Sequence, residues 1–314
     1  MSNKKKIFKD QRILLALVIV AIVAIVSMVN PKFIAVKNLI TIFQQISVIG
    51  ILTMAMSMLL ISGGIDLSIG NIMVLSGVVM AQLVSMEMGR PLAVLAGVLT
   101  AVICGAVNGF VIAKSKCIPL IITLGTSQIY YGLALTISGG RIMSFKGAFN
   151  AIGKTKLFGV FPVMLFLLAA MVLVSYFLMN KTKFGRRVVA LGGNEKNAFL
   201  SGINVTRYKI IVYSIAGFFC AVAAVVFSAR IDSITANAGT GYETSALTAA
   251  IIGGVTFDGG KGTISGAFLG CVLMGVISNA MNILQVETYV QTIITGIIIV
   301  CAVVLSNINN IKAK

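Results

Sequence analysis

The chain has 314 residues, of which 58% are hydrophobic and 11% are charged, and its formal net charge is +17. A soluble domain carries roughly 25% charged residues, so this chain could not cover its surface in water. Apolar runs of nearly 20 residues recur, and a bilayer core of ~30 Å needs about 20 apolar helical residues per crossing. The composition therefore predicts an all-α polytopic membrane protein. The basic residues are dispersed over short loops, which fits membrane topology and gives no reason to expect a nucleic-acid partner.

Hydropathy and loop signals predict ten spans in a single transmembrane domain covering residues 1–314. The first span, 13–29, follows a cytoplasmic N-terminus, 1–12, and we expect it to be retained because no small-residue cleavage site follows it. The other nine are expected at 42–61, 67–86, 91–113, 118–137, 161–179, 210–229, 243–255, 263–284 and 289–306, before a cytoplasmic C-terminus, 307–314. With the N-terminus inside, cytoplasmic segments hold 17 of the 25 Lys and Arg residues, as the positive-inside rule requires.

A weak internal repeat relates the two halves of the chain. Asn108 and Asn279 are separated by 171 residues, and so are Gly125 and Gly296. The spans of the first half align with those of the second under roughly this shift. Because an odd number of crossings separates corresponding spans, the two repeats would be inverted in the membrane, as is common in transporters.

The stretch SGGIDLSIG, residues 62–70, places a carboxylate and two adjacent glycines in apolar sequence. In the predicted topology it forms the inner turn between the second and third spans, where Gly63 and Gly64 end one helix and Asp66 caps the next. Capping contributes ~1 kcal/mol, whereas a carboxylate at the bilayer centre would cost ~2.5–3.5 kcal/mol. If the helix is instead broken inside the membrane, Asp66 would line the permeation path. We favour capping, and Asp258 invites the same two interpretations.

Few other polar residues lie within the spans. Amides suit hydroxyl-rich neutral solutes because each can donate and accept hydrogen bonds, but they equally serve to join helices. The candidates for the translocation pathway or its gating are Gly63, Gly64, Asp66, Ser68, Asn71, Asn108 and Asn279. The near lack of intramembrane carboxylates beyond the turns argues against a proton relay.

The longest polar stretch, 180–209, contains the signals of a short helix. Asn194 suits its N-cap, Glu195 its first turn, and Gly202 the left-handed position past its end. Phe199 makes one side of this helix apolar. Such a helix must pack either on the inner surface of the protein itself or on a cytoplasmic partner, and the residues leave both alternatives open.

The stretch GGVTFDGGKGTISGAFLG, residues 253–270, superficially looks like a phosphate-binding loop. Two glycines precede Lys261 where the motif allows one, and no strand precedes the stretch, so we do not expect nucleotide binding here. We expect a tight cytoplasmic turn in which glycines take positive φ, namely Gly259, Gly260 and Gly262. The glycines then recur every four residues up to Gly270, which offers a smooth face for helix packing.

Together these motifs carry a family resemblance. The segment FGRRVVALGGNEKNAFLSGI, residues 184–203, resembles the coupling segment of permease subunits of ATP-binding-cassette importers for simple sugars. The stretches 62–70 and 253–270 resemble two further hallmarks of that family, and AVNGFVIAKSKCIPLIITLGT, residues 106–126, also fits its pattern. The similarity is nearest to the ribose-type permeases and covers nearly the whole chain, apart from the N-terminal region and the loop 138–160.

The resemblance implies a non-catalytic permease subunit, with no cofactor or metal, that moves a simple sugar across a bacterial cytoplasmic membrane by alternating access. In this family the coupling segment docks in a cleft of the ATPase subunit. The residues implied here are Gly185, Arg186, Gly192, Asn194, Glu195, Phe199, Ser201 and Gly202. The implied partners are that ATPase, an extracytoplasmic solute-binding protein, a second permease copy (identical or closely related) and the lipid bilayer.

Two other classes of function compete with this interpretation. A secondary symporter needs no ATPase but usually carries ionisable residues at mid-membrane, which this sequence lacks. A membrane-embedded enzyme needs a catalytic constellation, and the chain has no histidine, no metal-binding spacing and no paired carboxylates.

Overall fold

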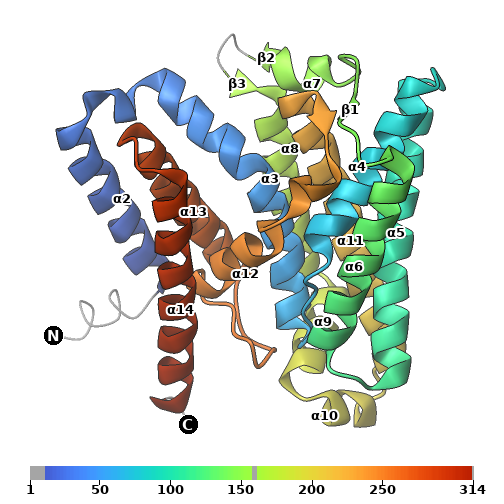
Figure 1. Ribbon diagram of the computed structural model, residues 1–314. Helices are drawn as coiled ribbons and strands as arrows, with labels where there is room; N and C mark the ends of the chain where they lie inside the picture. The colour runs from blue at the N-terminus through green and yellow to red at the C-terminus, as the bar shows by residue number, and fades with distance from the viewer. Residues whose placement is uncertain (1–10, 158–160, 313–314) are drawn as a thin grey trace, which may run out of the picture.

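The computed structural model describes residues 11–157 and 161–312 and is built almost entirely of helices (Figure 1). The long helices are α2 (Gln11–Val29), α3 (Val36–Ile61), α5 (Arg90–Ser115), α6 (Pro119–Ser138), α8 (Val163–Lys181), α11 (Val205–Ile231), α13 (Ile264–Ile283) and α14 (Thr288–Lys312). The short ones are η1 (Pro31–Ile34), α4 (Ile69–Ser85), α7 (Asn150–Lys154), α9 (Lys183–Gly193), α10 (Glu195–Leu200), η2 (Ala236–Gly239) and α12 (Tyr242–Ile252). The prediction of an all-α polytopic fold is confirmed. Most of the predicted tail 1–12, and the end of 307–314, lie outside the described residues.

Two-residue strands add small antiparallel pairings at one end of the molecule. β1 (Met143–Ser144) pairs with β4 (Ser233–Ile234), and β2 (Lys156–Leu157) pairs with β3 (Phe161–Pro162). These pairs lie together with α7 at the end opposite to α10 (Figure 1).

The prediction of ten full-length spans is not confirmed. Among the described residues, seven helices are long and apolar enough to cross a membrane: α2, α3, α5, α6, α8, α11 and α13. The predicted span 243–255 is instead α12, whose 11 residues reach only about 16 Å. Gly241 and Gly254 flank this helix with φ of +86° and +89°, which breaks it at both ends. The predicted span 67–86 is the 17-residue α4, which follows a non-helical segment.

The helix bounds follow the internal repeat. Adding 171 to the bounds of α3–α6 gives 207–232, 240–256, 261–286 and 290–309, close to the observed bounds of α11–α14. In each half a long helix is followed by a segment with no α-helix and then by a short α-helix. α3 ends beside α9, whereas α11 begins beside α10 and ends near α7, so the two halves run in opposite directions (Figure 1).

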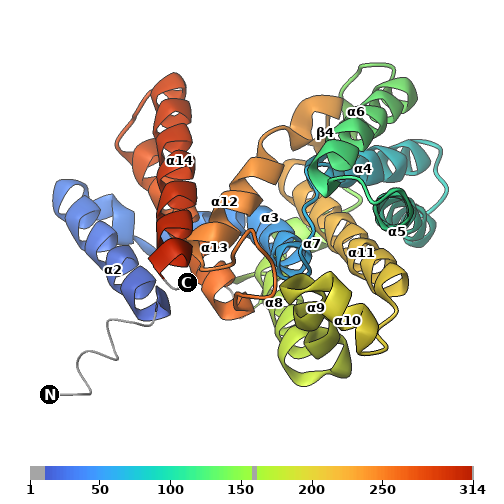
Figure 2. The ribbon, with the colours of Figure 1, turned by 90° about the horizontal axis from the view of Figure 1, so that it is seen from below.

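Glycines allow two helix pairs to pack backbone to backbone. A Cβ on Gly105 of α5 would overlap the carbonyl oxygen of Tyr213 in α11, and one on Gly217 of α11 would overlap that of Ala101. Gly270 of α13 meets α12 in the same way. Seen from below, α3 lies near the centre, while α2 and α5 lie at opposite edges (Figure 2). Close approach of this kind is how helices gain packing energy in lipid.

This packing predicts different outcomes for two glycine-to-alanine changes. Gly105→Ala should destabilise the protein by about 1–3 kcal/mol, because the added methyl group meets α11 backbone that cannot yield. Gly193→Ala in α9 is the matched control, since no described atom lies within 4 Å of its Cβ position. Thermal unfolding of the purified variants checks this, and an unchanged Tm for Gly105→Ala would contradict the packing.

Candidate functional site

Residues 62–68, between α3 and α4, form a loop that enters the helix bundle, here called the buried loop. Gly63 near its start is exposed, whereas Asp66 and Ser68 are buried. Asp66 is fully buried, and its Oδ1 accepts hydrogen bonds from the backbone N–H (2.8 Å) and the hydroxyl (2.5 Å) of Ser68. Its Oδ2 accepts from Nδ2 of Asn108 in α5 (3.0 Å). Asn108 lies seven residues before the end of α5, so the loop reaches about 10 Å into the bundle. The three donors offset the loss of water around a buried carboxylate.

The favoured capping interpretation of Asp66 is wrong in detail. α4 begins at Ile69, and its N-cap residue is Ser68. Asp66 instead bonds the backbone two residues ahead, as in an Asx turn that leads into the helix. Asp258 does not share this environment, because it is exposed, and α13 is capped by Thr263 through a hydrogen bond from the N–H of Gly266 (3.1 Å).

Tyrosines from α6 and α11 also hold the buried loop in place through hydrogen bonds. The hydroxyl of Tyr130 in α6 donates to Oδ1 of Asn108 (2.9 Å). The hydroxyl of Tyr213 in α11 donates to the carbonyl oxygen of Ile65 (2.9 Å), and its oxygen would lie 2.8 Å from a Cβ on Gly64. Sequence reasoning missed both tyrosines, because nothing in their local sequence relates them to a loop more than 60 residues away.

Six of the seven predicted pathway residues lie on or beside this loop: Gly63, Gly64, Asp66, Ser68, Asn71 and Asn108. Asn71 is half-buried in the first turn of α4, and its Nδ2 donates to the carbonyl oxygen (3.0 Å) and the hydroxyl (2.8 Å) of Ser127. Asn279 lies elsewhere. It is buried in α13, where its Oδ1 accepts from Nδ2 of Asn38 at the start of α3 (2.9 Å). Two asparagines related by the repeat therefore serve different clusters.

The start of α4 in the first repeat and the 3₁₀ helix η2 in the second repeat meet in the core. Gly70 in the first turn of α4 packs so closely on Gly239 of η2 that a Cβ on either would overlap the other's carbonyl oxygen. Glu243, in the first turn of α12, is half-buried beside Gly70, and its Oε1 accepts from the N–H of Gly241 (3.1 Å). A full-length span at 243–255 would place Glu243 at the membrane surface, so sequence reasoning did not count it among the intramembrane carboxylates.

The three glycine-rich motifs converge at the end of α3. A Cβ on Gly259 would lie 2.6 Å from the carbonyl oxygen of Gly192 and 2.8 Å from Cα of Gly63. A Cβ on Gly192 would lie 2.6 Å from the nitrogen of Gly260, whose N–H donates to the carbonyl oxygen of Ile61 (2.9 Å). Real Cβ atoms do not approach other atoms within 3.0 Å, so side chains are excluded here. We call Gly63, Gly192, Gly259 and Gly260 the glycine junction.

The backbone angles at this point are those that a glycine turn requires. φ is +78° at Gly63, +77° at Gly259 and +69° at Gly260, values that residues with a Cβ rarely adopt. Gly262 (φ +137°) packs on Val255 within the same turn. A glycine at each of these positions is required for at least one of two reasons. Either its backbone angle φ is positive, or a Cβ atom would overlap one of the other two segments.

The polar insert, residues 180–209, contains two helices between α8 and α11, of which only the second was predicted. Asn194 caps α10 by accepting from the N–H of Asn197 (2.9 Å), and Gly202 follows it with φ of +79°. Glu195 forms an ion pair with Lys209 of α11 (2.7 Å). The unpredicted α9 contains the candidates Gly185, Arg186 and Gly192, and Gly185 packs against the backbone of α8.

α10 has a buried side and an apolar exposed side. Ala198 is buried against the protein, whereas Phe199 and Leu200 are 68% and 72% exposed, and Ser201 is exposed beside them. Phe199 also borders a cavity of about 740 Å³ between α10 and the turn that joins α5 to α6. The helix therefore rests on its own protein and still presents two large apolar side chains outward.

Comparison with known proteins identifies similar chains. A family profile described as "Branched-chain amino acid transport system / permease component" matches residues 38–303. The chain is 34% identical to the ribose import permease of Haemophilus influenzae, over 95% of this chain and 93% of that protein. It is 38% identical to the D-allose transport permease of Escherichia coli (93% and 90% covered) and 36% identical to the L-arabinose transport permease of the same organism (90% and 86%). No solved structure matches the chain.

The hydrogen bonds of Asp66 predict how two substitutions differ. Asp66→Asn should keep normal insertion and most transport activity, because its Oδ1 still accepts from Ser68 and the Asn108 amide can turn to pair with the new NH₂ group. Asp66→Leu should lower Tm, since it leaves buried donors unpaired at about 1–3 kcal/mol each. Uptake and thermal unfolding of both variants check this. Loss of all transport in an Asp66→Asn protein with normal Tm would assign the carboxylate a direct role in the pathway instead.

Proposed function

Because the chain belongs to the family of transport-system permease components, we propose that it is the membrane-spanning subunit of an ATP-driven importer for a simple sugar. The observation that carries this proposal is similarity over nine-tenths of the chain to permeases named for ribose, allose and arabinose. In this role the chain is not an enzyme, and a separate ATPase subunit hydrolyses ATP. An extracytoplasmic binding protein delivers the sugar. The secondary-symporter alternative has no support among these relatives.

The ATPase is proposed to dock on α10. Fully burying a large apolar side chain contributes about 1.5–3 kcal/mol, so the exposed Phe199 and Leu200 are best explained by a partner that covers them. The insert is rich in cations as well, which marks this end as cytoplasmic by the positive-inside rule. α14 ends at the same end of the molecule as α10 (Figure 1), so this orientation puts the end of α14 in the cytoplasm. The basic residues that precede α2 put the N-terminus on the same side by the same rule.

Two faces of the molecule suit a second permease copy. α6 and α14 carry exposed apolar side chains, and no described atom lies within 4 Å of a Cβ placed on Gly125, Gly132 or Gly296. Gly125 and Gly296 correspond under the internal repeat. Small residues on lipid-exposed helices let partner helices approach closely, so we place the contact between copies on these two faces.

Docking on α10 predicts that Phe199→Asp disrupts the importer. An aspartate in the apolar contact should abolish co-purification with the ATPase subunit and ATP-driven sugar uptake in proteoliposomes. Phe161→Asp is the matched control, because Phe161 is a half-exposed phenylalanine at the opposite end of the molecule, and it should leave ATPase binding unchanged. If the Phe199→Asp chain takes up sugar normally with no ATPase bound, the importer proposal fails and a symporter is established.

The glycine junction is proposed to transmit ATPase closure. It joins the end of α9 to the end of α3 and to the turn before α13, and these segments lead directly into the buried loop and α12. Movement of the coupling segment must therefore displace both broken segments of the core.

This coupling predicts that alanine substitutions at two adjacent glycines in the last turn of α9 affect sugar uptake differently. Gly192→Ala should reduce ATP-driven uptake roughly tenfold while the ATPase still binds, because its methyl group pushes against Ile61 and Gly260. Gly193→Ala should behave as the unchanged protein, since no described atom lies within 4 Å of that Cβ. Equal uptake by the two variants would remove the junction from the coupling path.

A further inference from the structure

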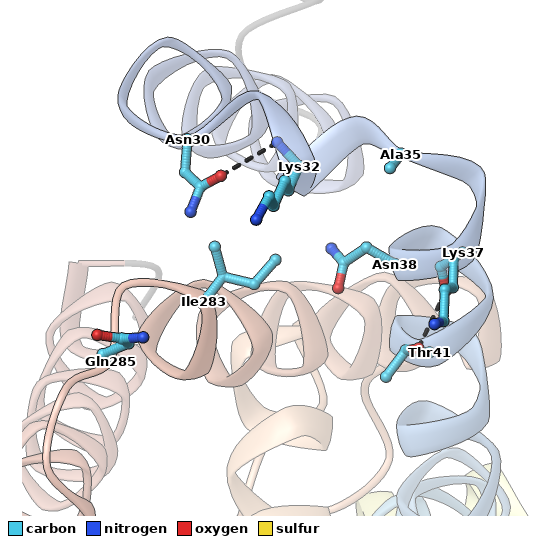
Figure 3. Close-up of a pocket in the computed structure, with 8 residues that line it drawn as sticks. All are labelled: Asn30, Lys32, Ala35, Lys37, Asn38, Thr41, Ile283 and Gln285. Atoms are coloured by element: carbon cyan, nitrogen blue, oxygen red, sulfur yellow. Dashed lines mark hydrogen bonds between the residues drawn. The ribbon is translucent and has the colours of Figure 1, made fainter.

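A donor-rich cavity lies at the end of the molecule opposite to α10, where α2 and α13 end and α3 begins. Its volume is about 520 Å³, a size that holds a small-molecule group. It is lined by two lysines, three amides and three further residues: Lys32, Lys37, Asn30, Asn38, Gln285, Thr41, Ala35 and Ile283. None of these eight described residues carries a carboxylate, so the cavity has an excess of positive charge. Figure 3 shows Asn30 and Lys32 facing Ile283 on one side of the cavity, and Asn38 between Ile283 and the pair Lys37 and Thr41 on the other.

The walls of this cavity are held by hydrogen bonds within the protein. Asn30 uses its Oδ1 to accept from the backbone N–H of Lys32 (3.1 Å) and cap η1, which leaves its NH₂ group for another partner. Asn38 donates to the carbonyl oxygen of Phe33 (2.8 Å) and to Asn279 (2.9 Å), so the start of α3 is tied to α13. Phe33, a residue of η1, is fully buried. These contacts hold the backbone that carries Lys32 and Lys37, whose side chains are exposed, so that only the side chains are ordered when a ligand binds.

The surroundings of the cavity are apolar. Met28 and Val29 at the end of α2 are 85% and 68% exposed, and Ile34 of η1 is 54% exposed. α2 is apolar enough to span the membrane, so its C-terminal end marks the boundary of the hydrocarbon core. Lys32 and Lys37 follow this end and therefore lie at the depth of the lipid headgroups, with apolar side chains beside them. A neutral sugar does not need two ammonium groups, and a soluble anion gains nothing from the apolar rim. An amphiphile with an anionic head satisfies both features.

We propose that this cavity binds an anionic phospholipid, in the leaflet that the orientation proposed above makes the outer one. Lys32 and the NH₂ group of Asn30 are the donors to its phosphate, and Lys37 adds a second positive charge on the opposite wall. The acyl chains lie along the exposed apolar side chains of α2 and η1. The bound lipid ties the α2–α3 connection to the end of α13. No residue of α6 or α14 lines the cavity, so the site is separate from the faces assigned to the second permease copy. The assignment does not depend on which solute the protein carries.

The test is lipid binding by the full-length detergent-purified protein, measured by native mass spectrometry and by the lipid-induced rise in Tm. The probes are phosphatidylglycerol, phosphatidylcholine with the same chains, and glycerol phosphate without chains. Each lysine near an anionic lipid contributes about a fivefold gain in affinity, so K32Q/K37Q should bind phosphatidylglycerol on the order of 30-fold more weakly. K154Q/K156Q removes the same charge from exposed lysines outside the cavity and should bind as the unchanged protein does.

A second variant keeps the proposal testable if the double lysine change fails to fold. Asn30→Asp retains the cap on η1, because aspartate accepts the same backbone hydrogen bond, yet it places a negative charge beside the phosphate. It should weaken phosphatidylglycerol binding with Tm in the absence of lipid unchanged. Equal phosphatidylglycerol binding by K32Q/K37Q and K154Q/K156Q overturns the site. Equal stabilisation by glycerol phosphate, or by phosphatidylcholine, overturns the anionic lipid as its ligand.

Discussion

The contact on which the rest of the architecture depends is made by backbone alone. At the glycine junction, the N–H of Gly260 donates to the carbonyl oxygen of Ile61, while Gly63 and Gly192 pack against the same turn with no side chain between them. Side chains can change rotamer and absorb a displacement, but backbone in contact cannot. A shift of α9 must therefore appear at the end of α3 and in the turn before α13. In the proposed importer this rigidity connects the ATPase to the core.

The core that receives this displacement consists of two broken segments. The loop 62–68 leads into α4, and α4 meets η2 where Gly70 packs on Gly239. Inverted repeats with discontinuous helices commonly place the transport path at such a point. The buried carboxylate of Asp66 holds the first segment, and its oxygens are satisfied by Ser68 and Asn108. Removing one partner from such a network is destabilising, because the others stay buried without hydrogen bonds. Fastening a broken segment this tightly lets it move as a unit with the helix that precedes it.

Local chemistry decided which features the sequence could predict. The ends of α10 follow from Asn194 and Gly202, and the glycine turn from positive φ, because these depend only on neighbouring residues. Hydropathy predicted the all-α class but also predicted that α12 is a full-length span. An average of residue hydropathy contains no information on backbone angles, so it cannot show that the glycines on either side end the helix. The partners of Asp66 and the meeting of three glycine motifs were beyond sequence reasoning. They join residues brought together only by tertiary packing, as when Tyr213 reaches Ile65.

The central claim is that α9, with α10 attached to it, and the 253–263 turn move as one body when ATP binds, because Gly192 of α9 packs on Gly259 and Gly260 of that turn. Spin labels at Lys196 and Asp258, both exposed, allow the distance between these segments to be measured by pulsed electron paramagnetic resonance in the complex with the ATPase. The exposed Cys117 and Cys301 must first be replaced by serine. The account predicts one narrow distance distribution that is the same in the nucleotide-free and ATP-bound complexes, while a control pair at Lys196 and Lys146 changes. A change between positions 196 and 258 on ATP binding would contradict rigid transmission through the glycine junction.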